Sequence, residues 1–351
     1  MRVRLSDIAA RAGVSEATVS RVLNDKPGVS AENRRAILAT MERLGYERPS
    51  RPRTSGLVGL IVPELDNPVF PTFAQGIETA LARQGFTPVL CTQAPGGVHE
   101  DEYVRMLLDR RVSGIIFVSG MHANTDTDPA RYVQLREQGL PIVLVNGYVA
   151  GVDAPFLSAD DRAAVDMAVQ HLAELGHRSI GLAMGPERYL PVQRKVAAFD
   201  VAMRRHVSAD LAPAERASLV EYSVFSVDGG AEATAALLDR GVTAVVCGSD
   251  VMALGAIREG RSRGLRLPED LSIVGSDGIP NAEFFSPALT TLSSPIEDMA
   301  EAAARALLAE IAGERVPRAE YVFRPELVVR GSTTAPRRSS GRLAQRQERR
   351  T

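Results

Sequence analysis

The chain has 351 residues, 45% hydrophobic and 24% charged, which suits a globular protein with enough apolar mass for two or three domains. No run of about 18 apolar residues could span a membrane, and the first residues lack the apolar stretch of a secretory signal. We therefore expect no membrane contact and a cytoplasmic location. Residues 1–55 hold 11 Lys/Arg against 6 Asp/Glu, and residues 336–351 hold 6 Arg against 1 Glu. Since the net charge is only −2, the middle of the chain is acidic, and a basic head on an acidic body indicates that only the head meets a polyanion.

Residues 4–46 predict three short helices and no strand. Serine is a favoured N-cap, and glycine adopts the left-handed conformation in which helices commonly end. The predicted bounds are Arg4 or Ser6 to Gly13 for the first helix, Ser15 as cap of 16–23 for the second, and Ser30 to Gly45 for the third.

From residue 57 the pattern changes to short apolar runs that alternate with amphipathic stretches, which predicts parallel strands flanked by helices. The predicted strands are 57–62, 88–91, 114–118, 141–145, 179–184, 244–248 and 271–275. The predicted helices are 73–83, 100–110, 163–175, 195–205, 231–240 and 252–263. About 280 residues are too many for one such sheet, so we expect two lobes.

The predicted fold class is α/β, with an N-terminal three-helix headpiece and a two-lobed domain built from two parallel-sheet subdomains. The predicted divisions are a headpiece at 1–47, a short Pro-containing linker at 48–56, the two-lobed domain at 57–332 and a disordered basic tail at 333–351. Within the domain, lobe 1 is predicted at about 57–154 and 289–315, and lobe 2 at about 155–288 and 316–332.

The segment from Asp7 to Asn24 places two short helices around Gly13, with Ala9, Val14 and Val19 between them. Two helices joined by a short glycine-containing turn are typical of a helix-turn-helix, whose second helix enters the major groove of DNA.

This segment closely resembles the headpiece of the LacI/GalR family of bacterial repressors. Further motifs of that family follow in order along the chain: Gly59–Pro63, Asn67–Phe70, His171-Leu172, Leu175–Arg178, Ser249–Ala256, Pro268–Gly275, Leu289–Thr291 and Pro325–Gly331. The resemblance runs from about residue 4 to 332. It implies a periplasmic-binding-protein-like domain and a homodimer that binds a near-palindromic double-stranded operator.

The resemblance assigns base reading to three residues of the second helix, Glu16, Ala17 and Arg21. Arginine can pair with a guanine edge, alanine offers apolar contact to a thymine methyl, and glutamate either accepts from cytosine or faces solvent. The polar residues Ser15, Thr18, Ser20 and Asn24 suit phosphates.

The linker departs from the family, whose members usually carry a short helix here with a leucine that wedges into the minor groove. This linker is shorter, lacks leucine and contains Pro49 and Pro52, which oppose a helix. Two alternatives remain open: Arg51 and Arg53 lie extended in a narrow minor groove, or the segment is a plain tether.

The resemblance also assigns effector contacts in a cleft between the lobes. The residues are Phe70, Asn146, Asp160, Arg194, Lys195, Ser249 and Asp277. Carboxylates and amides that follow strands can hold sugar hydroxyls, and an aromatic ring can lie against a sugar face. Lys195 and Ser249 replace the arginine and asparagine usual in the family, and Asp160 could instead cap the next helix.

We expect a DNA-binding repressor controlled by a small-molecule effector, with a sugar as first choice and a nucleobase or nucleoside as second. The rival interpretations are a transport-type solute-binding protein without DNA function, and an enzyme. No nucleophile elbow, P-loop or metal-binding spacing is present, so we expect no catalytic residues, metal or cofactor. As a DNA-binding protein it should be associated with the nucleoid.

Overall fold

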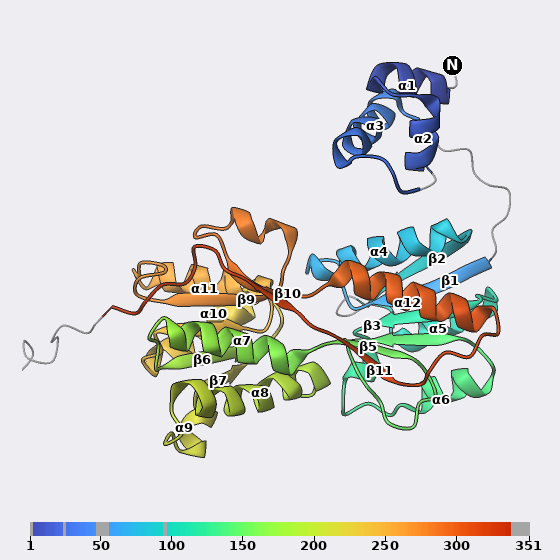
Figure 1. Ribbon diagram of the computed structural model, residues 1–351. Helices are drawn as coiled ribbons and strands as arrows, with labels where there is room; N and C mark the ends of the chain where they lie inside the picture. The colour runs from blue at the N-terminus through green and yellow to red at the C-terminus, as the bar shows by residue number, and fades with distance from the viewer. Residues whose placement is uncertain (1–2, 24–25, 47–55, 94–96, 338–351) are drawn as a thin grey trace, which may run out of the picture. The chain divides into compact units, whose positions relative to one another are not determined.

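The computed structural model describes residues 3–23, 26–46, 56–93 and 97–337. The chain divides into two compact units, Met1–Arg53 and Thr54–Thr351, and the second unit contains both lobes (Figure 1). None of the helices in the described ranges combines the length and apolarity that crossing a bilayer requires.

The headpiece consists of α1 (Leu5–Ala12), α2 (Glu16–Leu23) and α3 (Ala31–Leu44), which confirms the three predicted helices. Gly13 ends α1 at φ 67°, and the Ser30 hydroxyl accepts a hydrogen bond from Asn33 N at 3.2 Å at the start of α3. The apolar side chains that meet between the helices are Ile8, Ala9, Val19, Val22 and Ile37. This small core fixes α2 against the other two helices.

Lobe 1 is a six-stranded sheet with helices on both faces (Figure 1). Its strand order is β11-β5-β4-β3-β1-β2, all parallel. The strands are β1 (Gly56–Val62), β2 (Phe86–Thr92), β3 (Gly114–Val118), β4 (Ile142–Val145), β5 (Phe156–Ala159) and β11 (Glu320–Phe323). The helices are α4 (Val69–Arg83), α5 (Glu100–Asp109), the short η1 (Met121–Ala123), α6 (Ala130–Glu137) and α12 (Ile296–Ile311).

Lobe 2 repeats this layout with the order β12-β10-β9-β8-β6-β7, in which only the β10–β12 pair is antiparallel. The strands are β6 (Ile180–Met184), β7 (Val220–Tyr222), β8 (Ala244–Cys247), β9 (Ser272–Asp277), β10 (Thr290–Ser293) and β12 (Glu326–Val328). The helical elements are α7 (Asp161–Glu174), α8 (Leu190–Ala202), η2 (Met203–Val207), α9 (Pro213–Ala217), α10 (Val227–Asp239), α11 (Asp250–Ser262) and η3 (Pro280–Phe284).

The lobe boundaries predicted from the sequence are wrong at three places. Strand β5 belongs to lobe 1, because it pairs with β4 and β11, whereas we expected lobe 2 from residue 155. Strand β10 pairs with β9 in lobe 2, and β11 lies in lobe 1, each the reverse of the prediction. The chain therefore passes between the lobes three times, after β5, after β10 and after β11.

The predicted disordered tail begins too early at residue 333. The Thr333 hydroxyl and His171 Nε2 form a hydrogen bond of 3.0 Å, and Thr334 N donates to Ser272 Oγ at 3.0 Å. The part of the predicted tail from 338 on, like most of the predicted linker, lies outside the described residues.

Candidate functional site

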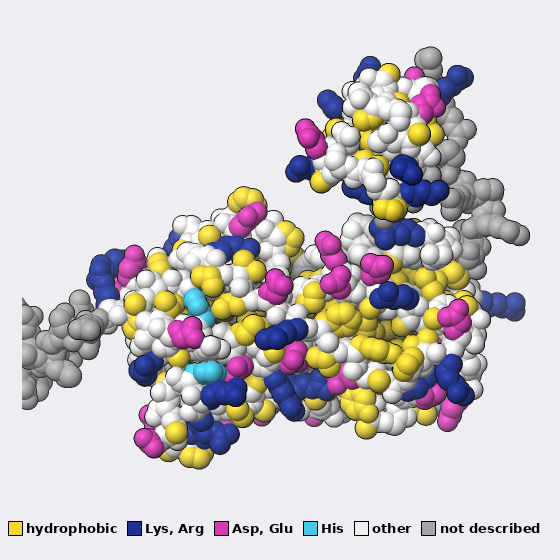
Figure 2. Space-filling model, in the orientation of Figure 1, with side chains coloured by type: hydrophobic (Ala, Val, Ile, Leu, Met, Phe, Trp, Pro, Cys, Tyr) yellow, Lys and Arg dark blue, Asp and Glu magenta, His cyan; other side chains and the backbone are white. Residues whose placement is uncertain are grey.

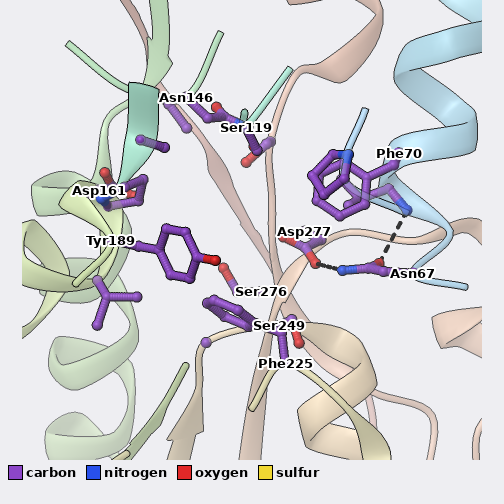
Figure 3. A pocket seen from close by; sticks show the side chains of 18 of the residues that line it. Asn67, Phe70, Ser119, Asn146, Asp161, Tyr189, Phe225, Ser249, Ser276 and Asp277 are labelled. Carbon is purple, nitrogen blue, oxygen red and sulfur yellow. Dashed lines mark hydrogen bonds between the residues drawn. The ribbon is translucent and has the colours of Figure 1, made fainter. Parts of the chain in front are cut away.

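A cavity of about 580 Å³ lies between the two lobes. Lobe 1 contributes the loop after β1, the start of α4 and the ends of β3 and β4, while lobe 2 contributes the starts of α7, α8 and α11 and the end of β9. Because the carboxyl ends of parallel strands meet at one edge of each sheet, the two edges face each other across this cavity (Figure 3).

Three cavity residues hold an unusual backbone conformation. Ser119 after β3, Asn146 after β4 and Asp277 at the end of β9 have φ values of 47°, 65° and 111°. Among described residues other than glycine, only Arg111 shares a positive φ. Such conformations carry a free-energy cost and gather at functional sites. Asn146 Nδ2 donates to Ser119 Oγ at 3.0 Å, so these two strand ends position each other.

Asp277 is the central acid of the cavity. Asn67 Nδ2, from the loop before α4, donates to Asp277 Oδ2 at 3.4 Å. Behind it lies the fully buried Asp250, which accepts hydrogen bonds from the Thr291 hydroxyl at 2.5 Å and from Ile279 N at 2.8 Å. Burial raises the pKa of both carboxyls, and the charge of Asp250 raises the pKa of Asp277 further. This end of the cavity can therefore hold a proton as well as accept hydrogen bonds.

Five of the seven effector residues predicted from the sequence line the cavity: Phe70, Asn146, Lys195, Ser249 and Asp277. Ser249 also caps α11, since its hydroxyl accepts from Met252 N at 3.1 Å. The Lys195 ammonium lies 3.5 Å from Asp161 Oδ1, which pairs a cation with an anion in the wall.

Asp160 and Arg194 were predicted at the effector site, but neither is among the residues that line the cavity. Asp160 caps α7, because its carboxylate accepts from Ala163 N at 3.0 Å, and the next residue, Asp161, lines the cavity instead. Arg194 donates to both carboxylate oxygens of Glu320, at 2.6 and 3.0 Å.

The sequence reasoning missed several wall residues, among them Asn67, Ser119, Asp161, Tyr189, Phe225 and Ser276. Ser119 directly follows a correctly predicted strand, so the rule that selected Asn146 could have found it. The Phe225 ring lies against Gly185, where a Cβ atom would come within 2.1 Å of it. That contact joins two loops of lobe 2 and leaves no mark in the local sequence.

In the headpiece, Ser15, Glu16, Ala17 and Arg21 are exposed, and Thr18 and Ser20 are partly buried. The Ser15 hydroxyl accepts from Thr18 N at 3.2 Å and hydrogen-bonds the Thr18 hydroxyl at 2.8 Å, so Ser15 also caps α2. In Figure 2 both the headpiece and the lobes show basic and acidic side chains on the face that is seen. The predicted contacts Asn24, Arg51 and Arg53 lie outside the described residues.

The part of the chain that the structure describes holds no group of three or more His, Cys, Asp or Glu side chains arranged to bind a metal ion.

Residues 4–49 match the model of bacterial regulatory proteins of the lacI family, and residues 169–333 match a periplasmic binding protein-like domain. The chain is 55% identical to the HTH-type transcriptional regulator reg1 of Streptomyces lividans, over 97% of this chain and all of reg1. The same values hold for the regulator MalR of Streptomyces coelicolor.

Two solved structures show the same architecture. The transcriptional regulator CelR in complex with cellobiose is 32% identical, with a TM-score of 0.70, over 94% of this chain and all of that one. The lac repressor dimer bound to operator and the anti-inducer ONPF is 27% identical, with a TM-score of 0.68, over 95% of this chain and all of that one.

Proposed function

Because the chain belongs to the LacI family of bacterial transcriptional regulators, whose members are not enzymes, we propose that it represses transcription as a homodimer on a near-palindromic operator under the control of a sugar. As a transcriptional regulator it acts in the cytoplasm, and we place it on the nucleoid, where its operator lies.

The proposal that the effector is a sugar rests on the cavity between the lobes. Its volume of about 580 Å³ lies within the range of about 300–1,000 Å³ typical of small-molecule sites. Carboxylates, amides and hydroxyls of both lobes line it, and the rings of Phe70, Tyr189 and Phe225 offer flat apolar faces (Figure 3). This mixture suits the hydroxyls and ring faces of a sugar. The related CelR is solved with cellobiose, and we propose a disaccharide here.

The DNA assignment depends on α2. Glu16, Ala17 and Arg21 are exposed on this helix, and we propose that they read base edges while Ser15, Thr18 and Ser20 contact phosphates. Arg21 can pair with a guanine, so Arg21→Ala should weaken specific binding by about 1–3 kcal/mol, roughly 5–150-fold, with sugar binding unchanged. Titration of labelled operator DNA measures this effect.

The proposed homodimer would cover apolar side chains that one copy leaves exposed. Phe284 in η3 has 78% of its surface exposed and Leu254 in α11 38%. Exposed apolar patches often mark interfaces, and the similar lac repressor structure is a dimer. We expect Phe284→Arg to shift the protein toward monomers in sedimentation experiments and to weaken operator binding, since two headpieces would no longer act together.

Selection of bound sequences from a random DNA pool tests the whole proposal, with and without cellobiose, maltose, trehalose and lactose. We expect a near-palindromic site whose recovery changes with one of these sugars. If recovery of the site changes with nucleosides but with none of the disaccharides, the effector is a nucleobase or nucleoside and not a sugar. Failure to enrich any site, with sugar binding retained, would contradict the operator assignment.

A further inference from the structure

Two loops from opposite lobes meet beside the cavity. The loop after η1 in lobe 1 carries Asn124 and Thr125, and the loop before α8 in lobe 2 carries Arg188 and Tyr189. Thr125 N and Thr125 Oγ1 both donate to the Arg188 carbonyl oxygen, at 2.8 and 2.9 Å, and Asn124 pairs with Tyr189 as an antiparallel bridge. We call these contacts the interlobe bridge. None of the three chain crossings lies in these loops, so separation of the lobes here must break the bridge.

The bridge is reinforced from helix α8. Gln193 Nε2 donates to Thr125 Oγ1 at 3.0 Å, so the Thr125 hydroxyl both accepts from lobe 2 and donates to it. The next residue of α8, Arg194, forms a bidentate ion pair with Glu320 of β11 in lobe 1. Burial opposes ionisation of Glu320, but the hydrogen bonds and the charge of Arg194 hold its pKa below the ordinary value. The start of α8 is thus tied to lobe 1 at two points.

Tyr189 connects this bridge to the cavity. It lies at the N-cap position of α8, and its ring points into the cavity (Figure 3). The Arg188 guanidinium lies 5.1 Å from the centre of that ring. Thr125 and Gln193 are not among the cavity-lining residues, but Thr125 hydrogen-bonds Arg188, the residue before Tyr189.

We propose that Tyr189 is a binding residue completed by lobe closure, and that Thr125 is the positioning residue that holds it over the ligand. This proposal rests on the proposed sugar function and adds the residues that couple binding to closure. The ligand and the interlobe bridge both favour the closed arrangement of the two lobes. Binding of the ligand therefore stabilises the bridge, and the bridge raises the affinity for the ligand. Loss of the bridge then lowers sugar affinity although no sugar contact is removed.

Calorimetric titration of the full-length protein with the same disaccharides tests the proposal. We expect Thr125→Val to weaken binding about two- to tenfold, which corresponds to one net hydrogen bond. Thr125→Val combined with Gln193→Leu should weaken binding further, and Thr125→Ser, which keeps the hydroxyl, should restore it. Thr127→Val, the same change two residues along the loop, serves as the matched control and should bind like the wild type.

A double-mutant cycle separates positioning from general damage to the fold. If Thr125 acts through Tyr189, Thr125→Val should cost little affinity once Tyr189→Ala has removed the ring. Equal losses in both backgrounds would overturn the role assigned to Tyr189. Wild-type affinity in the Thr125→Val, Gln193→Leu variant would overturn the positioning role proposed for Thr125.

If the wild-type protein binds none of the sugars, the proposed function fails and the bridge is tested without ligand. Small-angle scattering should then show a larger radius of gyration for the Thr125→Val, Gln193→Leu variant than for the wild type. Equal radii would overturn the proposed contribution of the Thr125 and Gln193 side chains to closure, independently of any ligand.

Discussion

The two lobes share one strand order but end their strands in different chemistry. Strand β4 of lobe 1 and strand β9 of lobe 2 occupy equivalent places, and each ends in a residue with positive φ that lines the cavity. In lobe 1 that residue is the amide Asn146, and in lobe 2 it is the acid Asp277. The same backbone feature therefore presents a neutral group from one side of the cavity and an ionisable group from the other.

The lobes also differ in how closely their helices approach. In lobe 2, a Cβ atom on Gly255 of α11 would lie 2.0 Å from the Val227 carbonyl oxygen of α10. In lobe 1, a Cβ atom on Gly76 of α4 would lie 2.8 Å from the Ala300 Cβ of α12. In lobe 2 the backbones of α10 and α11 thus pack directly on each other, whereas in lobe 1 the Ala300 side chain of α12 lies against the backbone of α4 at Gly76.

The largest predicted effect follows from this packing. Gly255→Ala should lower the free energy of unfolding by about 3 kcal/mol, because rigid backbone has to move. Gly76→Ala should lower it less, by about 1–2 kcal/mol, since α4 and α12 must also shift but the higher helix propensity of alanine offsets part of the clash. Urea unfolding followed by circular dichroism measures both. Equal losses of unfolding free energy would mean that the two helix pairs accept an added methyl group equally well.

Exchange of the two strand-end residues tests the chemical difference between the lobes. With the disaccharide identified by the operator assay and the titration made at pH 9, where Asp277 is ionised because its pKa is raised to about 8, Asp277→Asn should weaken binding by roughly 10–150-fold, since hydrogen bonds to an ionised group contribute about 1.5–3 kcal/mol.

The reciprocal change, Asn146→Asp, removes a neutral donor and should weaken binding only about two- to tenfold. Calorimetric titration gives both dissociation constants. A greater loss of affinity from Asn146→Asp than from Asp277→Asn would show that Asn146, and not Asp277, makes the stronger contact with the sugar.

The smallest predicted effect concerns pH. Burial raises the folded-state pKa of both Asp277 and Asp250 above the ordinary value of 3.8, and the charge of Asp250 raises that of Asp277 further, so the folded protein binds more protons than the unfolded chain above that pH. Their contribution to stability is complete below pH 3.8 and is lost as the pH rises through the raised pKa values. Asp277→Asn should therefore flatten the fall of unfolding free energy with rising pH, as urea titrations between pH 4 and 8 would show. An unchanged slope would contradict the raised pKa of Asp277.

The headpiece could be predicted almost residue by residue, because its caps and stops are local. Ser30, Gly13 and Gly45 occupy the predicted helix ends. The cavity could be predicted only in part. Asn146 follows the wholly apolar strand β4 and Asp277 ends the mostly apolar strand β9, so the sequence marks both, but each of β5, β10 and β11 includes polar residues and none is a continuous apolar run.

Neighbouring charged residues were the main source of error at the site. The sequence does not show which of Asp160 and Asp161, or of Arg194 and Lys195, faces the cavity. Tertiary contacts decide this: Asp160 caps α7, and Glu320, 126 residues from Arg194 in the chain, binds the arginine. Tyr189 and Phe225 were missed for the same reason, since loops that meet only in the folded state place them.

The three chain crossings bear on the order in which the protein is made. Lobe 1 receives α12 and its edge strand β11 from residues 296–323, after the whole central part of lobe 2 has been synthesised. Lobe 2 in turn awaits β12, which ends at Val328. Neither sheet can be completed on the ribosome until the last tenth of the chain emerges. By contrast the helices of the headpiece, all within the first 44 residues, can pack long before. Nascent chains thus expose a finished DNA-reading module well before the part that would control it exists.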